Sequence, residues 1–247
     1  MTNNQDKAVL FDMDGVLVDS MNVHWRAWEQ VFARRGIRIS SEVFAETSGL
    51  RARPVIRLLS GRDFDDAEVE AIIREEEDLA RALLCDDFPA MPGADELIRG
   101  LDEAGWKMAV GTSGPIDTIR LVLERLKEGR RIAATVVAAD VARGKPHPEV
   151  FLKAADKIGV SPSGSVVIED SIAGLEAARA GGFKAVALTS TFPADSLRPL
   201  ADLVVDSLLE LTPGRLDKLL ALRKAGLCGP RGLRAGKKRE GSGRFCV

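Results

Sequence analysis

The sequence has little cysteine, no long apolar run and almost no net charge. Its three cysteines, Cys85, Cys228 and Cys246, are too few and too scattered for a disulfide framework or a zinc site. We therefore expect a reducing compartment, the cytoplasm. No apolar stretch approaches the roughly 18 residues that a membrane-spanning helix needs, so we expect no membrane span. The polar start of the chain, residues 1–7, does not resemble a secretion signal.

The formal net charge of −2 is unevenly distributed along the 247 residues. Residues 223–247 contain eight basic residues and one acidic residue, a balance of +7, so residues 1–222 carry −9. The basic segment is rich in glycine and has no helical or strand period, and we interpret residues 223–247 as a disordered tail. Because the remainder of the chain is acidic, we expect no nucleic-acid partner.

Hydrophobic residues make up 45% of the chain, enough for a large folded core. Short apolar runs near residues 8–11, 108–110, 134–138, 165–168, 184–188 and 203–205 predict buried strands. Helical patterns separate most of these runs, as in right-handed βαβ units. The sequence therefore predicts an α/β fold, with a doubly wound parallel sheet formed by residues 1–19 and 89–222.

Residues 20–88 contain only helical periods. Apolar residues recur at helical spacing from Met21 to Phe32, and further helices are expected near residues 53–59 and 66–84. Asp65 and Glu68 have the spacing of a capping box at the start of the last of these helices. We interpret residues 20–88 as an all-helical domain inserted after the first strand.

Polar side chains follow four of the predicted strands. They are Asp12 and Asp14, Thr112 and Ser113, Lys145, and Glu169 with Asp170. Parallel sheets of this kind bind ligands at the carboxyl ends of their strands, so the four carboxylates are expected to converge. Each like-charged pair at about 5 Å would cost about 3 kcal/mol at an effective dielectric constant near 20. One lysine does not offset that repulsion, so we predict a divalent cation, and oxygen ligands favour Mg²⁺.

A divalent cation, an ammonium group, a hydroxyl and the amides of a glycine-rich helix start together suit a phosphoryl group. In such a site one carboxylate attacks phosphorus and forms an aspartyl phosphate. A second carboxylate exchanges protons with the leaving oxygen and then with water, and the others hold the metal.

Four motifs of the chain resemble those of the haloacid dehalogenase superfamily, in its branch of β-phosphoglucomutase-like sugar phosphatases. They are Asp12-Met13-Asp14-Gly15-Val16, Thr112-Ser113, Gly144-Lys145-Pro146 and Glu169-Asp170-Ser171. Asp-x-Asp-Gly alone is shared with calcium loops and plain turns, whereas four motifs at four strand ends are specific. The resemblance covers about residues 7–212.

The resemblance implies a role for each carboxylate. Asp12 would be the nucleophile and a metal ligand. Asp14 would be the general acid and base, and its backbone carbonyl would also contact Mg²⁺. Asp170 would bind the metal, and Glu169 would bind it directly or through water.

The resemblance also implies a phosphoryl site. Thr112 and the amides of the following residues, Ser113 and Gly114, would bind the phosphoryl oxygens. Lys145 would bridge the nucleophile and the phosphoryl group.

By the same resemblance, residues 20–88 form a cap that closes over the active site on hinges near residues 16–20 and 88–92. His24 would approach the general acid and base when the cap closes, and a partly buried structural histidine is the alternative. Gly49, Arg51 and Arg53 belong to a cap loop that would contact the substrate, and a solvated helix start is the alternative for the two arginines.

We therefore predict a Mg²⁺-dependent phosphohydrolase, a monomer, that acts on a small phosphorylated metabolite such as a sugar phosphate. The alternative within enzymes is a phosphosugar mutase, which needs a second phosphate site in the cap. Residues 74–78 place four acidic residues there, which favours hydrolysis. A dehalogenase would lack Asp14. A non-enzymatic phospho-receiver module would explain neither the inserted helices nor the acid pair after the lysine.

Overall fold

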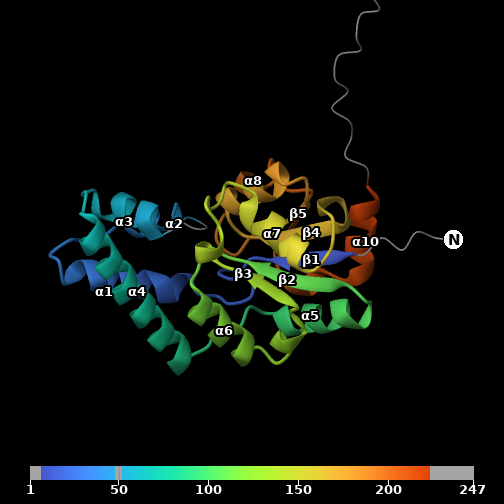
Figure 1. The fold of residues 1–247 in the computed structure, drawn as a ribbon, viewed down its shortest axis with the longest axis horizontal. Coiled ribbons are helices and arrows are strands. Elements are labelled where there is room, and N and C mark those ends of the chain that lie inside the picture. Colours follow the sequence, from blue (N-terminus) through green and yellow to red (C-terminus); the bar gives the residue numbers. More distant parts are fainter. Residues whose placement is uncertain (1–6, 48–49, 51, 223–247) are drawn as a thin grey trace, which may run out of the picture.

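The computed structural model describes residues 7–47, 50 and 52–222. Its centre is a six-stranded sheet in the order β3-β2-β1-β4-β5-β6, in which all neighbouring strands are parallel (Figure 1). The strands are β1 (Ala8–Phe11), β2 (Lys107–Gly111), β3 (Ala134–Val136), β4 (Ser165–Glu169), β5 (Lys184–Leu188) and β6 (Leu203–Val205). The strand order reverses between β1 and β4, which creates a crevice at their carboxyl ends. The predicted fold class is confirmed.

The sheet has a layer of helices on each face. The helices are α5 (Ala94–Glu103), α6 (Ile116–Arg125), α7 (Glu149–Lys157), α8 (Ile172–Ala180), α9 (Ala194–Leu197) and α10 (Pro213–Ala221). Four short 3-10 turns, η1 (Gly129–Arg131), η2 (Ala138–Asp140), η3 (Pro162–Gly164) and η4 (Leu208–Glu210), lie in the connections. The sequence analysis did not predict α9 or α10, although Thr212 and Pro213 are typical of a helix start.

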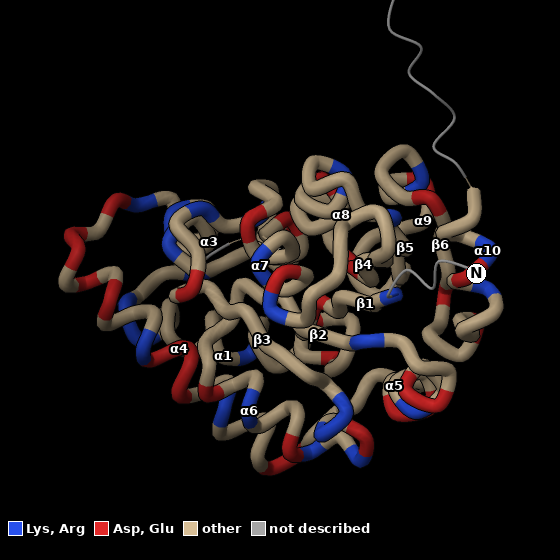
Figure 2. Tube along the Cα trace, turned by 45° about the vertical axis from the view of Figure 1, so that its right-hand side comes forward, with Lys and Arg blue, Asp and Glu red and all other residues tan. Residues whose placement is uncertain are grey.

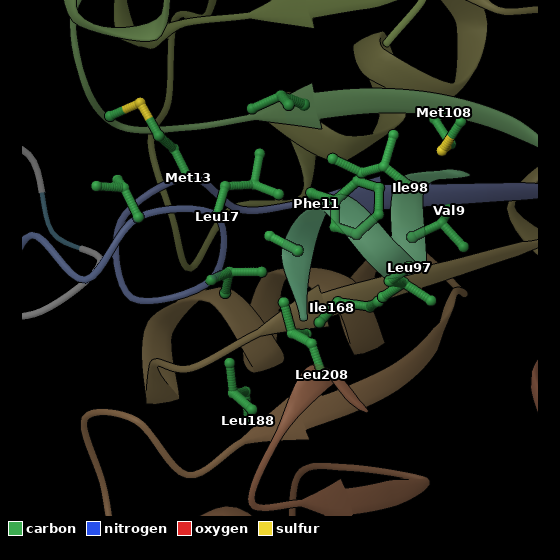
Figure 3. Packing of buried hydrophobic residues seen from close by; sticks show 14 of the residues in the cluster. Val9, Phe11, Met13, Leu17, Leu97, Ile98, Met108, Ile168, Leu188 and Leu208 are labelled. Atoms are coloured by element: carbon green, nitrogen blue, oxygen red, sulfur yellow. The ribbon is translucent and has the colours of Figure 1, made fainter. Parts of the chain in front are cut away.

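Successive side chains of β1 point to opposite faces of the sheet, and the core therefore has two layers. Val9 and Phe11 pack in one cluster with residues of α5, and Figure 3 shows them beside Leu97 and Ile98. Ala8 and Leu10 point to the opposite layer, which contains residues of α7 and α8. Both faces of β1 are therefore buried, which explains why this strand is a continuous apolar run.

The inserted block consists of α1 (Met21–Ala33), α2 (Ser41–Ala45), α3 (Ala52–Ser60) and α4 (Asp66–Asp86), which lie together to one side of the sheet (Figure 1). We call these four helices the cap. They share a separate hydrophobic cluster that includes Trp28, Phe32, Phe44, Ile56 and Ile72. The cap thus has a core of its own, as expected for an inserted helical unit.

The start of α4 follows a local capping rule. The amide of Glu68 donates to Asp65 Oδ1 at 2.8 Å, and the amide of Asp65 donates to Glu68 Oε2 at 3.1 Å. This confirms the predicted capping box of α4. The sequence analysis missed α2, because its five residues are too few to display a helical period.

The chain passes between the cap and the sheet domain twice, and the two passages pair with each other. Val18 forms an antiparallel bridge with Ala90. The amide of Asp19 donates to the Pro89 carbonyl at 2.8 Å, and the amide of Met91 donates to the Leu17 carbonyl at 3.1 Å. These passages are the segments that we predicted as hinges. Their movement and the domain bounds at 19/20 and 88/89 stay predictions.

Two further predictions concern regions at the margins of the fold. The basic tail, residues 223–247, lies outside the described residues. Among the helices that the structure describes, none has both the length and the apolar composition to cross a membrane.

Candidate active site

A buried cluster of opposite charges lies at the carboxyl ends of β1 and β4. Lys145 Nζ donates to Asp12 Oδ1 at 2.7 Å and to Glu169 Oε1 at 2.6 Å. The three side chains expose 6% or less of their surface. Because an isolated buried charge is very costly, each of these groups depends on the others. The structure thus brings together three of the residues predicted from the motifs.

Burial and repulsion shift the pKa of Asp12. Burial, together with the charges of Glu169 and Asp14, raises the pKa of Asp12 to about 7, although Lys145 opposes the increase. Burial alone would lower the pKa of Lys145, but the two carboxylates raise it above its usual range. Lys145 is therefore a permanent cation. Its ammonium also lies 5.0 Å from the centre of the Phe151 ring.

Glu169 is held in one orientation by its neighbours. Its Oε2 accepts hydrogen bonds from the amide of Asp170 at 2.8 Å, the amide of Ser171 at 2.7 Å and the Ser171 hydroxyl at 2.9 Å. Gly174 in α8 makes room for it, because a Cβ at Gly174 would lie 1.7 Å from Glu169 Oε1. The sequence analysis did not single out Gly174. A glycine in the first turn of a helix that follows an acid pair is the signal that could have indicated it.

Three of the four predicted metal ligands gather at one point. Asp12, Glu169 and Asp170 can each offer a carboxylate oxygen, and these oxygens lie within 4.8 Å of one another. The carboxylate of Asp14 is not part of this group. The role implied for Asp14 used its backbone carbonyl, and that contact stays a prediction.

Asp170 fits a cation site particularly well. Its Oδ2 accepts a hydrogen bond from the Thr191 hydroxyl, whereas its Oδ1 is buried and has no hydrogen-bond partner in the described part of the chain. Burial and the charges of Glu169 and Asp12 raise the pKa of Asp170 well above its usual value. A buried acceptor without a donor, next to two other carboxylates, is the environment that a divalent cation would satisfy.

Gly15 allows this close packing. Its φ is +74°, a left-handed conformation that favours glycine, and a Cβ there would lie 2.0 Å from Asp170 Oδ2. The glycine of the Asp-x-Asp-Gly motif is therefore required by both the turn and the neighbouring carboxylate.

A second network surrounds Asp14. Its Oδ1 accepts a hydrogen bond from the Ser20 hydroxyl at 2.5 Å and lies 3.3 Å from His24 Nε2. The other ring nitrogen, His24 Nδ1, lies 2.7 Å from Glu76 Oε1. His24 of α1 thus connects Asp14 at the end of β1 to Glu76 of α4. The structure places His24 beside Asp14, as the resemblance implied.

The network shifts the pKa values of His24 and Asp14 in opposite directions. Burial opposes the charge of His24, but Glu76 and Asp14 together raise the pKa of the imidazole well above 6.5. Burial would raise the pKa of Asp14, but the hydrogen bonds from His24 and Ser20 lower it below its ordinary value. At neutral pH, His24 therefore holds a proton next to an ionised Asp14.

The sequence analysis missed Glu76. We treated residues 74–78 as a run of acids, whereas the structure buries Glu76 to 4% exposure. Glu75 lies on a different side of α4, where it pairs with Arg34 and Arg35. Glu76 is four residues from both Ile72 and Ala80, which are buried, and this helical spacing is the signal that could have indicated it.

The loop after β2 contains the residues that we predicted to bind the phosphoryl group. Thr112 is buried at the end of the strand, and its Oγ1 accepts a hydrogen bond from the amide of Gly114 at 3.0 Å. In this structure the Gly114 amide thus donates within the loop, and its contact with a phosphoryl oxygen stays a prediction. The Thr112 hydroxyl hydrogen remains a donor. Ser113 and Gly114 line the pocket described next.

A pocket lies between the cap and the sheet domain, with Asp12 and Asp14 among its lining residues. The sheet domain contributes Thr112 and Lys145 as well. The cap contributes mostly apolar side chains, namely Met21, Trp28, Phe44, Leu50, Ala52, Val55 and Ala80. It also contributes His24, Thr47 and two carboxylates, Glu76 and Glu77.

Of the three predicted cap-loop residues, the structure describes only Arg53. Gly49 and Arg51 lie outside the described residues. Arg53 does not line the pocket, because its guanidinium pairs with Asp66 at 2.7 Å and with Glu70 at 3.7 Å. Arg53 thus pairs with the acidic start of α4. Spacing within the loop did not predict this partner.

The chain matches the model of the haloacid dehalogenase-like hydrolase family over residues 7–182. It is 33% identical to validoxylamine A 7'-phosphate phosphatase of Streptomyces hygroscopicus subsp. limoneus over 212 residues, 83% of this chain and 95% of that protein. It is 34% identical to hexitol phosphatase A of Escherichia coli (strain K12) over 208 residues, 83% of this chain and 93% of that protein.

The fold is also that of a solved relative. The crystal structure of a β-phosphoglucomutase from Clostridium difficile superposes with a TM-score of 0.80 over 88% of this chain and 98% of the other. The sequence identity is 23%, so this likeness concerns the fold.

Fold and site together define a hydrolase with a doubly wound sheet domain and a helical cap. The chain belongs to the haloacid dehalogenase-like hydrolase family. The family assignment made from the motifs is confirmed, and so is the predicted enzyme class, a phosphatase of this family.

Proposed function

We propose that this protein is a Mg²⁺-dependent phosphatase that hydrolyses the monophosphates of sugars or related polyols. The observation that carries the proposal is a pair of carboxylates at one pocket with opposite surroundings. Asp12 is buried against Lys145, whereas Asp14 is bonded to the imidazole of His24. The relatives named as phosphatases of validoxylamine A 7'-phosphate and of hexitols support the substrate class.

Asp12, Asp170 and Glu169 are the residues that would hold the metal, together with the Asp14 carbonyl. When bound, Mg²⁺ would offset the charge that these carboxylates and a phosphoryl group bring together. Both oxygens of Glu169 already accept hydrogen bonds, which favours contact through water for this residue.

In the first step, an oxygen of Asp12 would form a bond to phosphorus while the bond to the leaving oxygen breaks. In the resting site the proton is on His24, whose Nε2 lies 3.3 Å from Asp14 Oδ1. Asp14 would take this proton and give it to the leaving oxygen. An approaching phosphoryl dianion would raise the pKa of Asp14 and favour that transfer. Lys145 and the Thr112 hydroxyl would donate to the phosphoryl oxygens.

In the second step, water would attack the phosphorus of the aspartyl phosphate, and the bond to Asp12 would break. Asp14, now ionised, would accept the proton of the water molecule. The hydrogen bonds from Ser20 and His24 orient Asp14 for both proton transfers.

Hydrolysis fits this pocket better than mutase chemistry. A mutase would hold a second phosphate in the cap, but the cap lines the pocket with Glu76 and Glu77. Glu76 is paired with His24, but the carboxylate of Glu77 has no such partner in the described structure and would repel the second phosphate. From the low cysteine content we also propose a cytoplasmic location, and we propose that the protein is a monomer.

The direct test is a phosphate-release assay over hexitol phosphates, hexose phosphates and other phosphometabolites, with Mg²⁺ and with a chelator. We expect Mg²⁺-dependent release from several polyol or sugar monophosphates. Incubation with β-glucose 1-phosphate and a bisphosphate primer is the competing assay. Rapid formation of glucose 6-phosphate with little free phosphate would overturn the phosphatase proposal, and so would a folded enzyme inactive on the whole panel.

A further inference from the structure

The pocket contains one carboxylate that the proposed reaction does not use. Glu77 of α4 is half-buried and lines the pocket. Its side chain has no hydrogen bond or ion pair in the described part of the chain. Arg81, one turn away on the same helix, is paired instead with Asp78 at 2.5 Å. Burial, with the neighbouring Glu76, raises the pKa of Glu77. The carboxylate of Glu77 can therefore accept a hydrogen bond from a molecule in the pocket.

The cations that line the pocket, as far as the structure describes it, are already engaged. Lys145 is bound by Asp12 and Glu169, and His24 is bound by Asp14 and Glu76. Thr47 also uses its hydroxyl internally, donating to the Phe44 carbonyl at 2.7 Å. The cap side of the pocket therefore presents apolar side chains to the leaving group of a substrate. In the described structure, Glu77 is its unpaired anionic acceptor.

Figure 2 shows charged residues along α4, but they differ in their surroundings. Glu75 is neutralised by Arg34 and Arg35, and Glu76 by His24. Glu77 is the neighbouring carboxylate without such a partner in the described structure, and it lines the pocket. Its charge is thus available for the substrate rather than for the fold.

We propose that Glu77 selects the leaving group of the substrate. This inference rests on the phosphatase function proposed above. Its carboxylate accepts hydrogen bonds from hydroxyl or ammonium groups, which are strong because the acceptor is charged and partly desolvated. The same charge disfavours a leaving group that carries a second anion. The preferred substrates are therefore monophosphates of neutral or amine-bearing polyols, rather than bisphosphates or phosphorylated sugar acids.

The test compares three substrates of similar size with the wild-type enzyme and Glu77→Gln, each assayed with Mg²⁺. The substrates are glucosamine 6-phosphate, sorbitol 6-phosphate and 6-phosphogluconate, which differ in the charge of the leaving group. In wild type we expect the lowest kcat/KM for 6-phosphogluconate. In Glu77→Gln, the ratio of kcat/KM for glucosamine 6-phosphate over 6-phosphogluconate should fall by about tenfold or more.

Asp86→Asn is the matched control. It removes the same charge from the same helix at an exposed position that does not line the pocket. We expect the ratios to remain within about twofold of wild type, because a solvated charge at that position is screened. Thermal unfolding of each variant checks the fold, and glutamine has a helix propensity close to that of glutamate.

A second variant, Glu77→Lys, reverses the sign of the charge and should move the ratio further in the same direction. The inference is overturned if wild type hydrolyses all three substrates but prefers 6-phosphogluconate. It is also overturned if neither Glu77 variant changes the ratio more than Asp86→Asn does. If the folded wild-type enzyme releases phosphate from none of a wide panel, the phosphatase proposal itself fails, and the two failures are thus distinguishable.

Discussion

The two sides of the pocket are built in different ways. On the sheet side, the charged groups of Asp12, Lys145 and Glu169 are buried and bonded to one another. On the cap side, the walls are mostly apolar and Glu77 has no partner in the described residues. The comparison suggests that the sheet side is organised for the reaction and the cap side for recognition. Buried charges need partners, as Asp12, Lys145 and Glu169 have, whereas Glu77 is only half-buried and can remain available to the substrate.

His24 and Glu76 join the two sides. Both belong to the cap, yet their hydrogen bonds end at Asp14 on the sheet domain. The cap thus contributes to the surroundings of Asp14, the proposed acid–base group, as well as to the walls of the pocket. The following predictions test where the division between reaction and recognition lies, beginning with the sheet side.

Asp12→Asn is expected to have the largest effect. An amide is a poor nucleophile, so turnover should fall by about four orders of magnitude or more while the protein stays folded. Steady-state kinetics on the best polyol phosphate measures the loss, and thermal unfolding checks the fold. Turnover within tenfold of wild type would assign the nucleophile to another group.

Asp170→Asn should act through the metal. Loss of one anionic oxygen ligand should raise the Mg²⁺ concentration needed for half-maximal activity by about 10- to 100-fold. Without metal, stability should be unchanged or slightly higher, because the substitution relieves repulsion from Glu169 and Asp12. Titration with Mg²⁺ and thermal unfolding in chelator measure the two effects. A clear loss of metal-free stability with an unaltered Mg²⁺ requirement would make Asp170 a structural residue.

Gly174→Ala tests whether the orientation of Glu169 matters. The new Cβ would lie 1.7 Å from Glu169 Oε1, so the carboxylate must move and its bond to Lys145 must break or lengthen. We expect kcat/KM to fall by about tenfold or more and stability to fall by about 1–3 kcal/mol.

Gly100→Ala in α5 is the control for this substitution. Its new Cβ would come no closer than 4.0 Å to Pro213 Cδ, so alanine should be neutral or stabilising by up to about 1 kcal/mol. Equal effects of the two substitutions on activity would show that Glu169 tolerates displacement.

Glu76→Gln should have a smaller effect, and one that depends on pH. The pKa of His24 in the folded protein is raised above its unfolded value of about 6.5, so its ion pairs stabilise the fold below that pH. This contribution is lost as the pH rises through the raised pKa. The variant should therefore lower the melting temperature more at pH 6 than at a pH above the folded pKa of His24.

Glu75→Gln is the matched control for Glu76→Gln. Glu75 pairs with Arg34 and Arg35, which do not titrate in this range, so its effect on the melting temperature should vary less with pH. Melting curves of both variants between pH 6 and pH 10 provide the comparison. A loss at Glu76 that does not vary with pH would mean that His24 is not held as a cation.

The sequence was most informative where the chain forms the sheet. Buried parallel strands appear as short apolar runs, and their carboxyl ends meet at one edge. Asp12, Thr112 and Asp170 could therefore be assigned to one site without coordinates. Local signals also predicted the start of α4, because the capping box depends only on residues close in sequence.

The cap was harder to predict, because the sequence does not specify what each helix face meets. Residues 75–77 are three consecutive glutamates, and successive residues of a helix point about 100° apart. Packing of α4 against the rest of the protein directs Glu75 to two arginines, Glu76 to His24 and Glu77 to the pocket. Arg53 was assigned to the substrate but pairs with Asp66, a partner 13 residues away on another helix.

The sequence by itself thus determined the fold class and the strand ends, and it predicted the residues proposed for the reaction, because these depend on apolar periodicity and on motifs of adjacent residues. Tertiary structure alone decided that Gly174 leaves space for Glu169, that His24 joins Asp14 to Glu76, and that Glu77 is left without a partner in the described structure. These features depend on how residues of different elements are placed against one another, and they exist only once the helices have packed at a particular rotation.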